Sequence, residues 1–222
     1  MKRWLLDNRR FVVFLLLFSV FRTAVADWNP IPSGSMRPTL LEGDVVFVNR
    51  LAFDLKVPLT DVIVAHLGTP QRGDIVTFSS PKGGTRLIKR IAAVPGDTVE
   101  MRDNRLTING EAVEYAPLGE VSEPLGAHRV VPAERARESF GASTHTIQWL
   151  PQIASRSSFD PLVIPPDQYL MLGDNRDNSE DSRYFGLVSR ELLIGRAERI
   201  LVSADIMDHW QPRLDRFGSS LH

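Results

Sequence analysis

The clearest strand signal in this chain is RLIKRIAAV, residues 86–94, a run of branched and apolar residues that stops at the turn sequence Pro95-Gly96-Asp97. Because alternate residues of a strand share a face, Lys89 is predicted to lie on an apolar surface. The residues expected on that surface with it are Leu87, Ile91 and Ala93. Lysine is rarely buried unless it is paired or functional, and burial lowers its pKa from about 10.4. The structural alternative is an edge-strand lysine whose ammonium group reaches water.

Similar runs elsewhere predict a mostly β chain. They are short, rich in branched and aromatic residues, and bounded by Gly, Pro or Asp. These runs are residues 44–48, 74–78, 169–172 and 200–202. Residues 105–108 and 111–113 flank Asn109-Gly110, which favours a two-residue hairpin turn. Helical signals are few, and residues 189–193 predict only a short turn.

Residues 116–162 have a different character, being rich in Pro, Ser, Ala and charges with weak periodicity. This stretch predicts an inserted subdomain or long loops. The bounds of the predicted insertion are set somewhat wider, at about 103–165. Within this region, residues 146–151 could form one strand.

Composition excludes several classes of function. The 222 residues suffice for one sizeable domain, and the net charge of −1 gives no general footprint for nucleic acid. Cysteine is absent, so disulfides, thiolate metal sites and thiol nucleophiles are excluded. The five histidines show no metal-ligand spacing, and we expect no metal or cofactor.

The N-terminus predicts export. Lys2, Arg3, Arg9 and Arg10 precede the apolar run 11–21, so the N-terminus is expected in the cytoplasm and the rest outside. The short apolar core and the ending Ala24-Val25-Ala26 fit a cleaved signal peptide, which length alone favours. Residues 11–26, with Arg22 reaching the interface and Trp28 beyond it, form a short but possible membrane span.

Two further segments carry chemistry. Ser35 lies in IPSGSMRPTL, residues 31–40, about nine residues beyond the apolar segment. A serine becomes a nucleophile when a base takes its proton, and the Ser33 hydroxyl and the Ser35 N–H could hold an oxyanion. The alternative is a Ser/Gly/Pro linker. Residues 173–186 form a dense polar loop. A calcium-binding loop is excluded there, because Ser182 and Val188 stand at the positions where such a loop requires glycine and glutamate.

Together these segments resemble bacterial type I signal peptidase, the leader peptidase family of membrane-bound Ser/Lys proteases. The resemblance rests on four segments in the family's order. They are Pro32-Ser33-Gly34-Ser35-Met36 with Pro38-Thr39-Leu40, Arg72-Gly73-Asp74-Ile75-Val76, Ile88-Lys89-Arg90 with Pro95-Gly96-Asp97, and residues 173–186. They cover most of residues 29–100 and 163–200, while about 103–165 matches no motif of the family.

The resemblance implies a role for each site residue. Ser35 is expected as the nucleophile and Lys89 as the general base, with Ser33 in the oxyanion hole and Ser179 orienting the Lys89 amine. Asp181 and Arg183 are expected to brace the site as a salt bridge. Shallow pockets for small substrate residues are expected from Met36, Leu40, Leu87 and Ile88. Phe78 and Met171 are expected to desolvate Lys89.

The resemblance also implies a fold and a place in the cell. The expected fold is an antiparallel β catalytic core with a smaller inserted β/loop subdomain, preceded by one N-terminal transmembrane helix. Residues 1–10 are then cytoplasmic, 11–26 a retained single-pass anchor and 27–222 the exported catalytic domain, on the periplasmic side of the bacterial inner membrane. The enzyme would act as a monomer on preproteins at the lipid bilayer, cutting after Ala-x-Ala, and would bind no nucleic acid.

On the residues alone, two other classes stay open. One is a non-enzymatic exported β-domain that binds partners after its signal peptide is cleaved, with Ser35 in a tether. The other is a self-cleaving Ser/Lys regulator, for whose usual DNA-binding helix pair the exported N-terminus leaves no room. Ala24-Val25-Ala26 also raises the hypothesis that the enzyme cleaves itself after Ala26.

Overall fold

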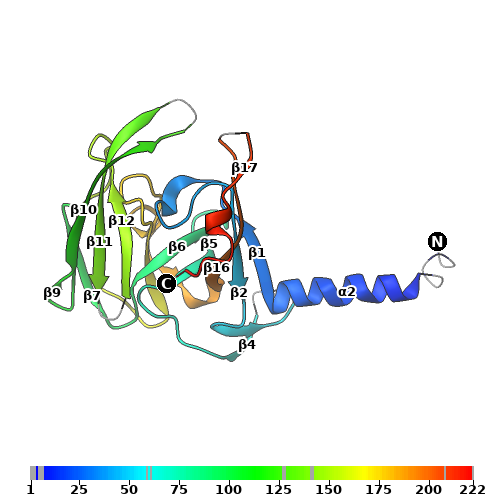
Figure 1. Ribbon diagram of the computed structural model, residues 1–222. Helices are drawn as coiled ribbons and strands as arrows, with labels where there is room; N and C mark the ends of the chain where they lie inside the picture. The colour runs from blue at the N-terminus through cyan, green and yellow to red at the C-terminus, as the bar shows by residue number, and fades with distance from the viewer. Residues whose placement is uncertain are drawn as a thin grey trace.

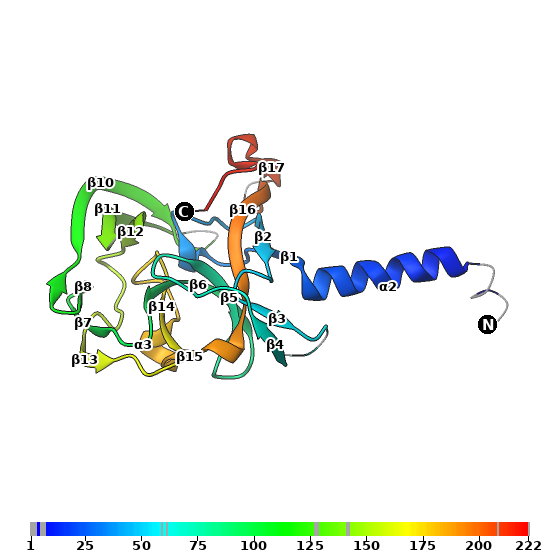
Figure 2. The same cartoon turned by 90° about the horizontal axis from the view of Figure 1, so that it is seen from below.

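The computed structural model describes residues 4, 8–58, 60, 62–126, 129–140, 143–207 and 209–221, with residue 16 described by its backbone alone. The domain is built from antiparallel sheets, which confirms the predicted mainly β class (Figure 1). A helix, α2 (Arg9–Ala24), projects from one side of it, as both ribbon views show (Figure 2).

The largest sheet contains the strand that carries Lys89. Its strand order is β1-β2-β16-β5-β6-β14-β15, with β17 paired to β16 as the eighth strand. The bounds are β1 (Ala26–Pro30), β2 (Asp44–Asn49), β5 (Ile75–Ser79), β6 (Arg86–Ala93), β14 (Gln168–Leu172), β15 (Val188–Ser189), β16 (Leu193–Asp205) and β17 (Gln211–Pro212). The five strands predicted for this sheet are present, and residues 200–202 are a small part of the 13-residue β16.

Strand β6 carries Lys89 beside Val76 of β5, and Leu87 beside Phe78. Leu87 and Ile91, which flank Lys89 on its face, pack into one apolar cluster with Phe78. The pairing of β6 with β14 shifts between Ile91 and Ala93, as at a β-bulge. The prediction that Ala93 shares the face of Lys89 is therefore wrong, because Ala93 packs into a different cluster.

The middle of the chain is more regular than its sequence predicts. It forms a three-stranded antiparallel sheet of β10 (Glu114–Pro124), β11 (Val130–Phe140) and β12 (Ser143–Trp149). We call this the inserted sheet. The strand predicted at 146–151 is β12, but β10 and β11 were not predicted, because charged residues interrupt the apolar alternation that indicates a strand.

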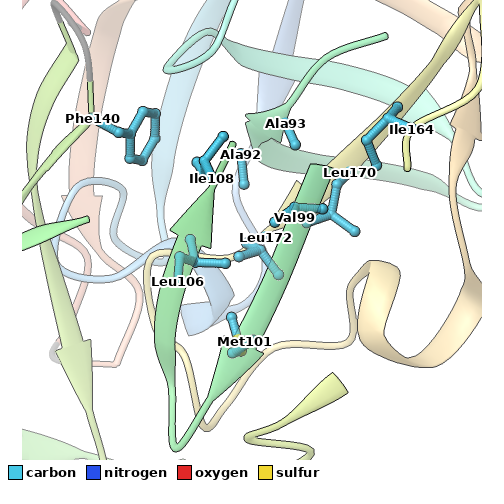
Figure 3. Close-up of a cluster of buried hydrophobic side chains, with 10 residues drawn as sticks. All are labelled: Ala92, Ala93, Val99, Met101, Leu106, Ile108, Phe140, Ile164, Leu170 and Leu172. Carbon is cyan, nitrogen blue, oxygen red and sulfur yellow. The ribbon is translucent and has the colours of Figure 1, made fainter. Parts of the chain in front are cut away.

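A four-stranded sheet joins the inserted sheet to the core. Its strands are β13 (Phe159–Val163), β7 (Thr98–Arg102), β8 (Arg105–Ile108) and β9 (Glu111–Ala112). The predicted Asn109-Gly110 hairpin is confirmed: both residues have positive φ, 55° and 81°, as the two-residue turn requires. Figure 3 shows Val99 and Leu106 packed against Leu170 and Leu172 of β14. Residue 103, where the insertion was predicted to begin, lies in the turn between β7 and β8.

Short elements complete the fold. They are β3 (Asp54–Lys56) and β4 (Ile63–His66), the single turns η1 (Gly34–Met36), η2 (Arg190–Leu192) and η3 (Leu214–Arg216), and the helix α3 (Ser182–Phe185). The turn predicted at 189–193 is η2, a 3₁₀ turn.

Helix α2 runs almost directly into β1. Arg22 of its last turn donates to Asp27 at 3.2 Å and stacks over the Trp28 ring, 4.4 Å from its centroid. The anchor was predicted at 11–26, but the helix ends at Ala24 and Ala26 already belongs to β1. Residues 1–3 and 5–7 of the predicted cytoplasmic segment lie outside the described residues. In the part of the chain that is described, every helix falls short of the length and apolarity required to cross a membrane.

Candidate active site

Ser35 sits in η1, just beyond β1. The turn is closed by the Arg37 N–H, which donates to the Gly34 carbonyl at 3.1 Å. Asn175 holds the same turn from the polar loop, because its side chain donates to Gly34 O at 2.9 Å and its backbone N–H to Ser35 O at 3.2 Å. The half-buried Ser35 side chain is therefore carried on a tightly fixed backbone.

Lys89 reaches Ser35 across the fold. Its Nζ donates to Ser35 Oγ at 2.6 Å and to Ile88 O at 3.0 Å, although Ser35 and Lys89 are 54 residues apart in sequence. Lys89 is only 3% exposed. Phe78 and Met171, both completely buried, belong to the apolar cluster on its side of β6. The amine is thus both in contact with the hydroxyl and shielded from water.

Burial lowers the pKa of Lys89 to about 8, because removing an ammonium group from water disfavours its charged form. The negative charges of Asp181, Asp174 and Glu180 oppose this by raising the pKa. Desolvation is the larger effect. A substantial fraction of the amine is therefore neutral slightly above neutral pH, as a general base requires.

The polar loop borders Ser35 through Gly173. A Cβ at Gly173 would collide with the Ser179 hydroxyl and come within 2.5 Å of the Ser35 carbonyl, so glycine is needed for this close approach. The buried Ser179 Oγ has no hydrogen-bond partner among the described residues. The structure thus brings Ser179 to the edge of the site, but without the predicted hydrogen bond to Lys89.

Asp181 and Arg183 form a buried ion pair at 2.8 Å. Asp181 also accepts from the Gly173 N–H at 3.1 Å, and Arg183 donates to the Arg176 carbonyl at 2.5 Å. The pair therefore ties together the two ends of the loop that borders Ser35.

The remaining predicted site residues differ in how far their side chains are exposed. Ser33 is exposed, in extended conformation immediately before η1. Leu87 and Ile88 are half-buried and offer surface to a ligand. Met36 and Leu40 are completely buried in the core. They lie beneath the surface on which a substrate residue would rest.

Sequence reasoning missed a second buried charge cluster beside the first. Arg90 donates to both oxygens of Asp174, at 2.9 and 2.7 Å, and Thr39 donates to Asp174 at 2.5 Å. The signal was present in the strand at 86–94. A strand buried on both faces places Arg90 opposite Lys89, where an arginine needs a carboxylate partner.

Within the described residues, no three histidine, aspartate or glutamate side chains are grouped to hold a metal ion.

Comparisons with known proteins identify the family. Residues 1–202 match the family model for signal peptidase, peptidase S26. The signal peptidase I of Pseudomonas fluorescens is 36% identical over 211 residues, covering 88% of this chain and 72% of that protein. The signal peptidase I of Buchnera aphidicola subsp. Schizaphis graminum is 31% identical, covering 94% of this chain and 79% of that protein.

A solved signal peptidase I from Enterococcus faecalis aligns with a TM-score of 0.34 and 32% identity, covering 58% of this chain and 96% of that chain. The family model and the sequence relatives each span most of the 222 residues. The chain therefore belongs to the signal peptidases of peptidase family S26, serine endopeptidases that remove signal peptides from other proteins.

Proposed function

We propose that this signal peptidase cleaves its substrates by attack of Ser35 Oγ, with the neutral amine of Lys89 as general base. The observation that carries the proposal is the 2.6 Å contact between Lys89 Nζ and Ser35 Oγ, at a position where burial lowers the lysine pKa to about 8. A hydroxyl needs such a neighbouring base to become nucleophilic.

The proposed reaction has two halves. Neutral Lys89 takes the Ser35 proton as Oγ bonds to the scissile carbonyl carbon, and the resulting ammonium then returns that proton to the leaving amine as the C–N bond breaks. Lys89, neutral again, next takes a proton from water as the water oxygen bonds to the acyl carbon of the Ser35 ester. The ester C–O bond then breaks, the Lys89 ammonium returns the proton to Ser35 Oγ, and the signal peptide leaves with a new C-terminal carboxyl group. Lys89 thus alternates between base and acid, and no other proton carrier is required.

We assign stabilisation of the developing oxyanion to the Ser35 N–H and the Ser33 hydroxyl. The exposed Ser33 side chain and the backbone fixed by Asn175 support this assignment. Ser179 is proposed to orient the Lys89 amine. Its position against Gly173, which touches the Ser35 backbone, supports that role, and a rotation of its hydroxyl toward Lys89 is then required.

The proposed substrates are preproteins with Ala-x-Ala before the scissile bond. An extended peptide that adds as a strand beside residues 31–33 and 87–88 presents alternate side chains to one surface. Leu87 and Ile88 form the accessible part of that surface, and Met36 and Leu40 support it from the core. Such a shallow apolar surface suits alanine.

We further propose that the protein acts as a monomer attached to the bacterial inner membrane, with its N-terminus cytoplasmic and its catalytic domain periplasmic. The supporting observation is that α2 exposes large apolar side chains rather than burying them in the domain. They include Phe11, Phe14, Leu17 and Phe21. Exposed apolar surface of this extent needs a lipid or protein cover.

The test is cleavage of a preprotein with an Ala-x-Ala site by Ser35→Ala and Lys89→Ala. We expect each substitution to lower kcat by at least about a thousandfold. Ser122→Ala and Lys82→Ala, which alter exposed residues of the same types, serve as controls and should cleave at the normal rate. Unchanged turnover in either active-site variant would rule out this mechanism.

A further inference from the structure

A buried side chain of the inserted sheet, Glu123, reaches the segment that carries the nucleophile. In β10 its neighbours Ser122 and Pro124 are exposed, whereas Glu123 is only 1% exposed. Its carboxylate accepts from Arg37 Nη1 at 2.5 Å, across 86 residues of sequence. Arg37 lies two positions after Ser35, so the inserted sheet contacts the turn itself.

Arg37 lies directly against the backbone of that turn. A Cβ placed on Gly34 would be 3.1 Å from Arg37 Cδ and 2.9 Å from Glu42 Oε1. Arg37 Nε in turn donates to Glu42 at 2.7 Å. The Arg37 and Glu42 side chains therefore cover the Gly34 Cα on the outer side of η1, and the Arg37 N–H closes the turn from within the backbone.

Glu123 is itself held on its second oxygen. Arg135 of β11 donates to Glu123 Oε2 at 2.9 Å, and the Glu123 side chain is 2% exposed. Charge-assisted bonds on both oxygens fix the carboxylate in one position. Glu123 therefore forms a rigid connection from β11 through Arg37 to Gly34.

We propose that Glu123 is a positioning residue for the reaction at Ser35. By fixing Arg37 it fixes the Gly34–Ser35 backbone, and with it the direction of the Ser35 hydroxyl toward Lys89 and of the Ser35 N–H toward the oxyanion. This inference rests on the proposed function of Ser35 and Lys89. It gives the inserted sheet, which carries no recognised motif, a role in the chemistry.

The first test is Glu123→Gln, which keeps the shape of the side chain and removes its charge. We expect kcat to fall by about tenfold to a hundredfold with KM within about twofold, because small displacements of reacting groups reduce rate rather than ground-state binding. Glu120→Gln removes the same charge from an exposed position of the same strand and should leave both constants unchanged. An unchanged kcat in Glu123→Gln overturns the proposal.

The second test is whether Glu123 acts through Arg37. In an Arg37→Met background, the further change Glu123→Gln should lower kcat by less than about twofold, since the contact between them is already lost. Losses that multiply would show that Glu123 acts independently of Arg37, and that result also overturns the proposal. If Glu123→Gln fails to fold, Arg37→Met is compared with Glu42→Gln, because Arg37 bonds to both carboxylates and only Arg37→Met also breaks the contact with Glu123. The kcat of Arg37→Met should fall further, with KM unchanged. Equal losses of kcat in the two variants overturn the proposal.

The activity of Ser35→Ala separates a failure of the proposed mechanism from a failure of the positioning role alone. If Ser35→Ala retains activity, the proposed mechanism is wrong and the positioning role is wrong with it. If Ser35→Ala is inactive while Glu123→Gln matches the wild-type protein, the mechanism stands and only the positioning role is lost.

Discussion

Each face of β6 buries one cation, Lys89 on one and Arg90 on the other, and the two cations have opposite kinds of surroundings. Lys89 is 3% exposed and faces apolar side chains, where its Nζ donates to the Ser35 hydroxyl and the Ile88 carbonyl. Arg90 is 2% exposed and faces Asp174, which accepts two hydrogen bonds from its guanidinium. Burial is equal on the two faces, but the partners differ.

The difference shows that burial alone does not determine what a cation does. Without a directly bonded carboxylate, the Lys89 ammonium is disfavoured and its pKa falls to about 8, which makes the amine available for proton transfer. Asp174 compensates Arg90 on the other face, and Arg90 also donates to Gly73 O at 2.8 Å. One face of the strand is thus suited to chemistry and the other to holding the site together.

The largest expected effect is a loss of stability when the ion pair between Arg90 and Asp174 is removed. Asp174→Ala leaves Arg90 buried without its carboxylate and should lower the free energy of unfolding by about 3–5 kcal/mol. Urea unfolding at pH 7 measures it. Asp160→Ala is the control, because Asp160 pairs with Arg102 on the surface, with 91% of its side chain exposed, and should change stability by less than about 1 kcal/mol. Equal effects in the two variants would remove the contrast between the faces.

On the apolar face, replacing the buried cation Lys89 is expected to stabilise the protein rather than destabilise it. Lys89→Met should be inactive yet raise the free energy of unfolding at pH 7 by about 2–3 kcal/mol, since an apolar chain of similar length replaces a poorly solvated ammonium. Between pH 8 and 10.5 the unfolded wild-type chain binds more protons at Lys89 than the folded chain, so wild-type stability rises with pH there. The advantage of Lys89→Met should therefore shrink and vanish above pH 10.5. Destabilisation at pH 7 would contradict this account.

The pH dependence of the rate tests the same pKa directly. With neutral Lys89 as base, kcat/KM, which reports ionisations of the free enzyme, should rise about tenfold per pH unit below the lysine pKa of about 8 and level off above it. Initial rates between pH 6 and pH 10 on a preprotein substrate give the profile. A midpoint near about 6.5, typical of a histidine, would be incompatible with this base.

The smallest expected effect measures how much a nearby surface charge contributes to the pKa of Lys89. Glu180 is exposed, and its negative charge raises the pKa of Lys89 against the effect of burial. Glu180→Gln should move the midpoint of the rate profile to lower pH by less than about half a unit, because solvent screens an exposed charge. Glu114→Gln, an exposed change on β10, should not move it. A shift to higher pH would show that the charge acts in another way.

Sequence reasoning succeeded where a local pattern or a motif carried the information. Strand alternation put Lys89 on an apolar face, and the order of motifs suggested that Ser35 would meet it. An inserted β/loop subdomain and its strand β12 were predicted, but β10 and β11 were missed, because inward-facing positions of these two strands hold Glu123 and Glu138 rather than apolar residues. Their partners, Arg37 and Arg176, come from distant parts of the chain. Such pairing is a property of the folded state that no local window reveals.

The direct passage from α2 into β1 bears on the durability of the protein. Ala24-Val25-Ala26 is a sequence that the proposed selectivity would accept, yet Ala26 is paired with Asn49 and only 7% exposed. The Asp27 carboxylate that follows accepts from Arg22 and Arg86. To be cut by another copy, this bond would have to leave its sheet and surrender those contacts. Under the proposed selectivity, cleavage after Ala26 would therefore require β1 to separate from β2.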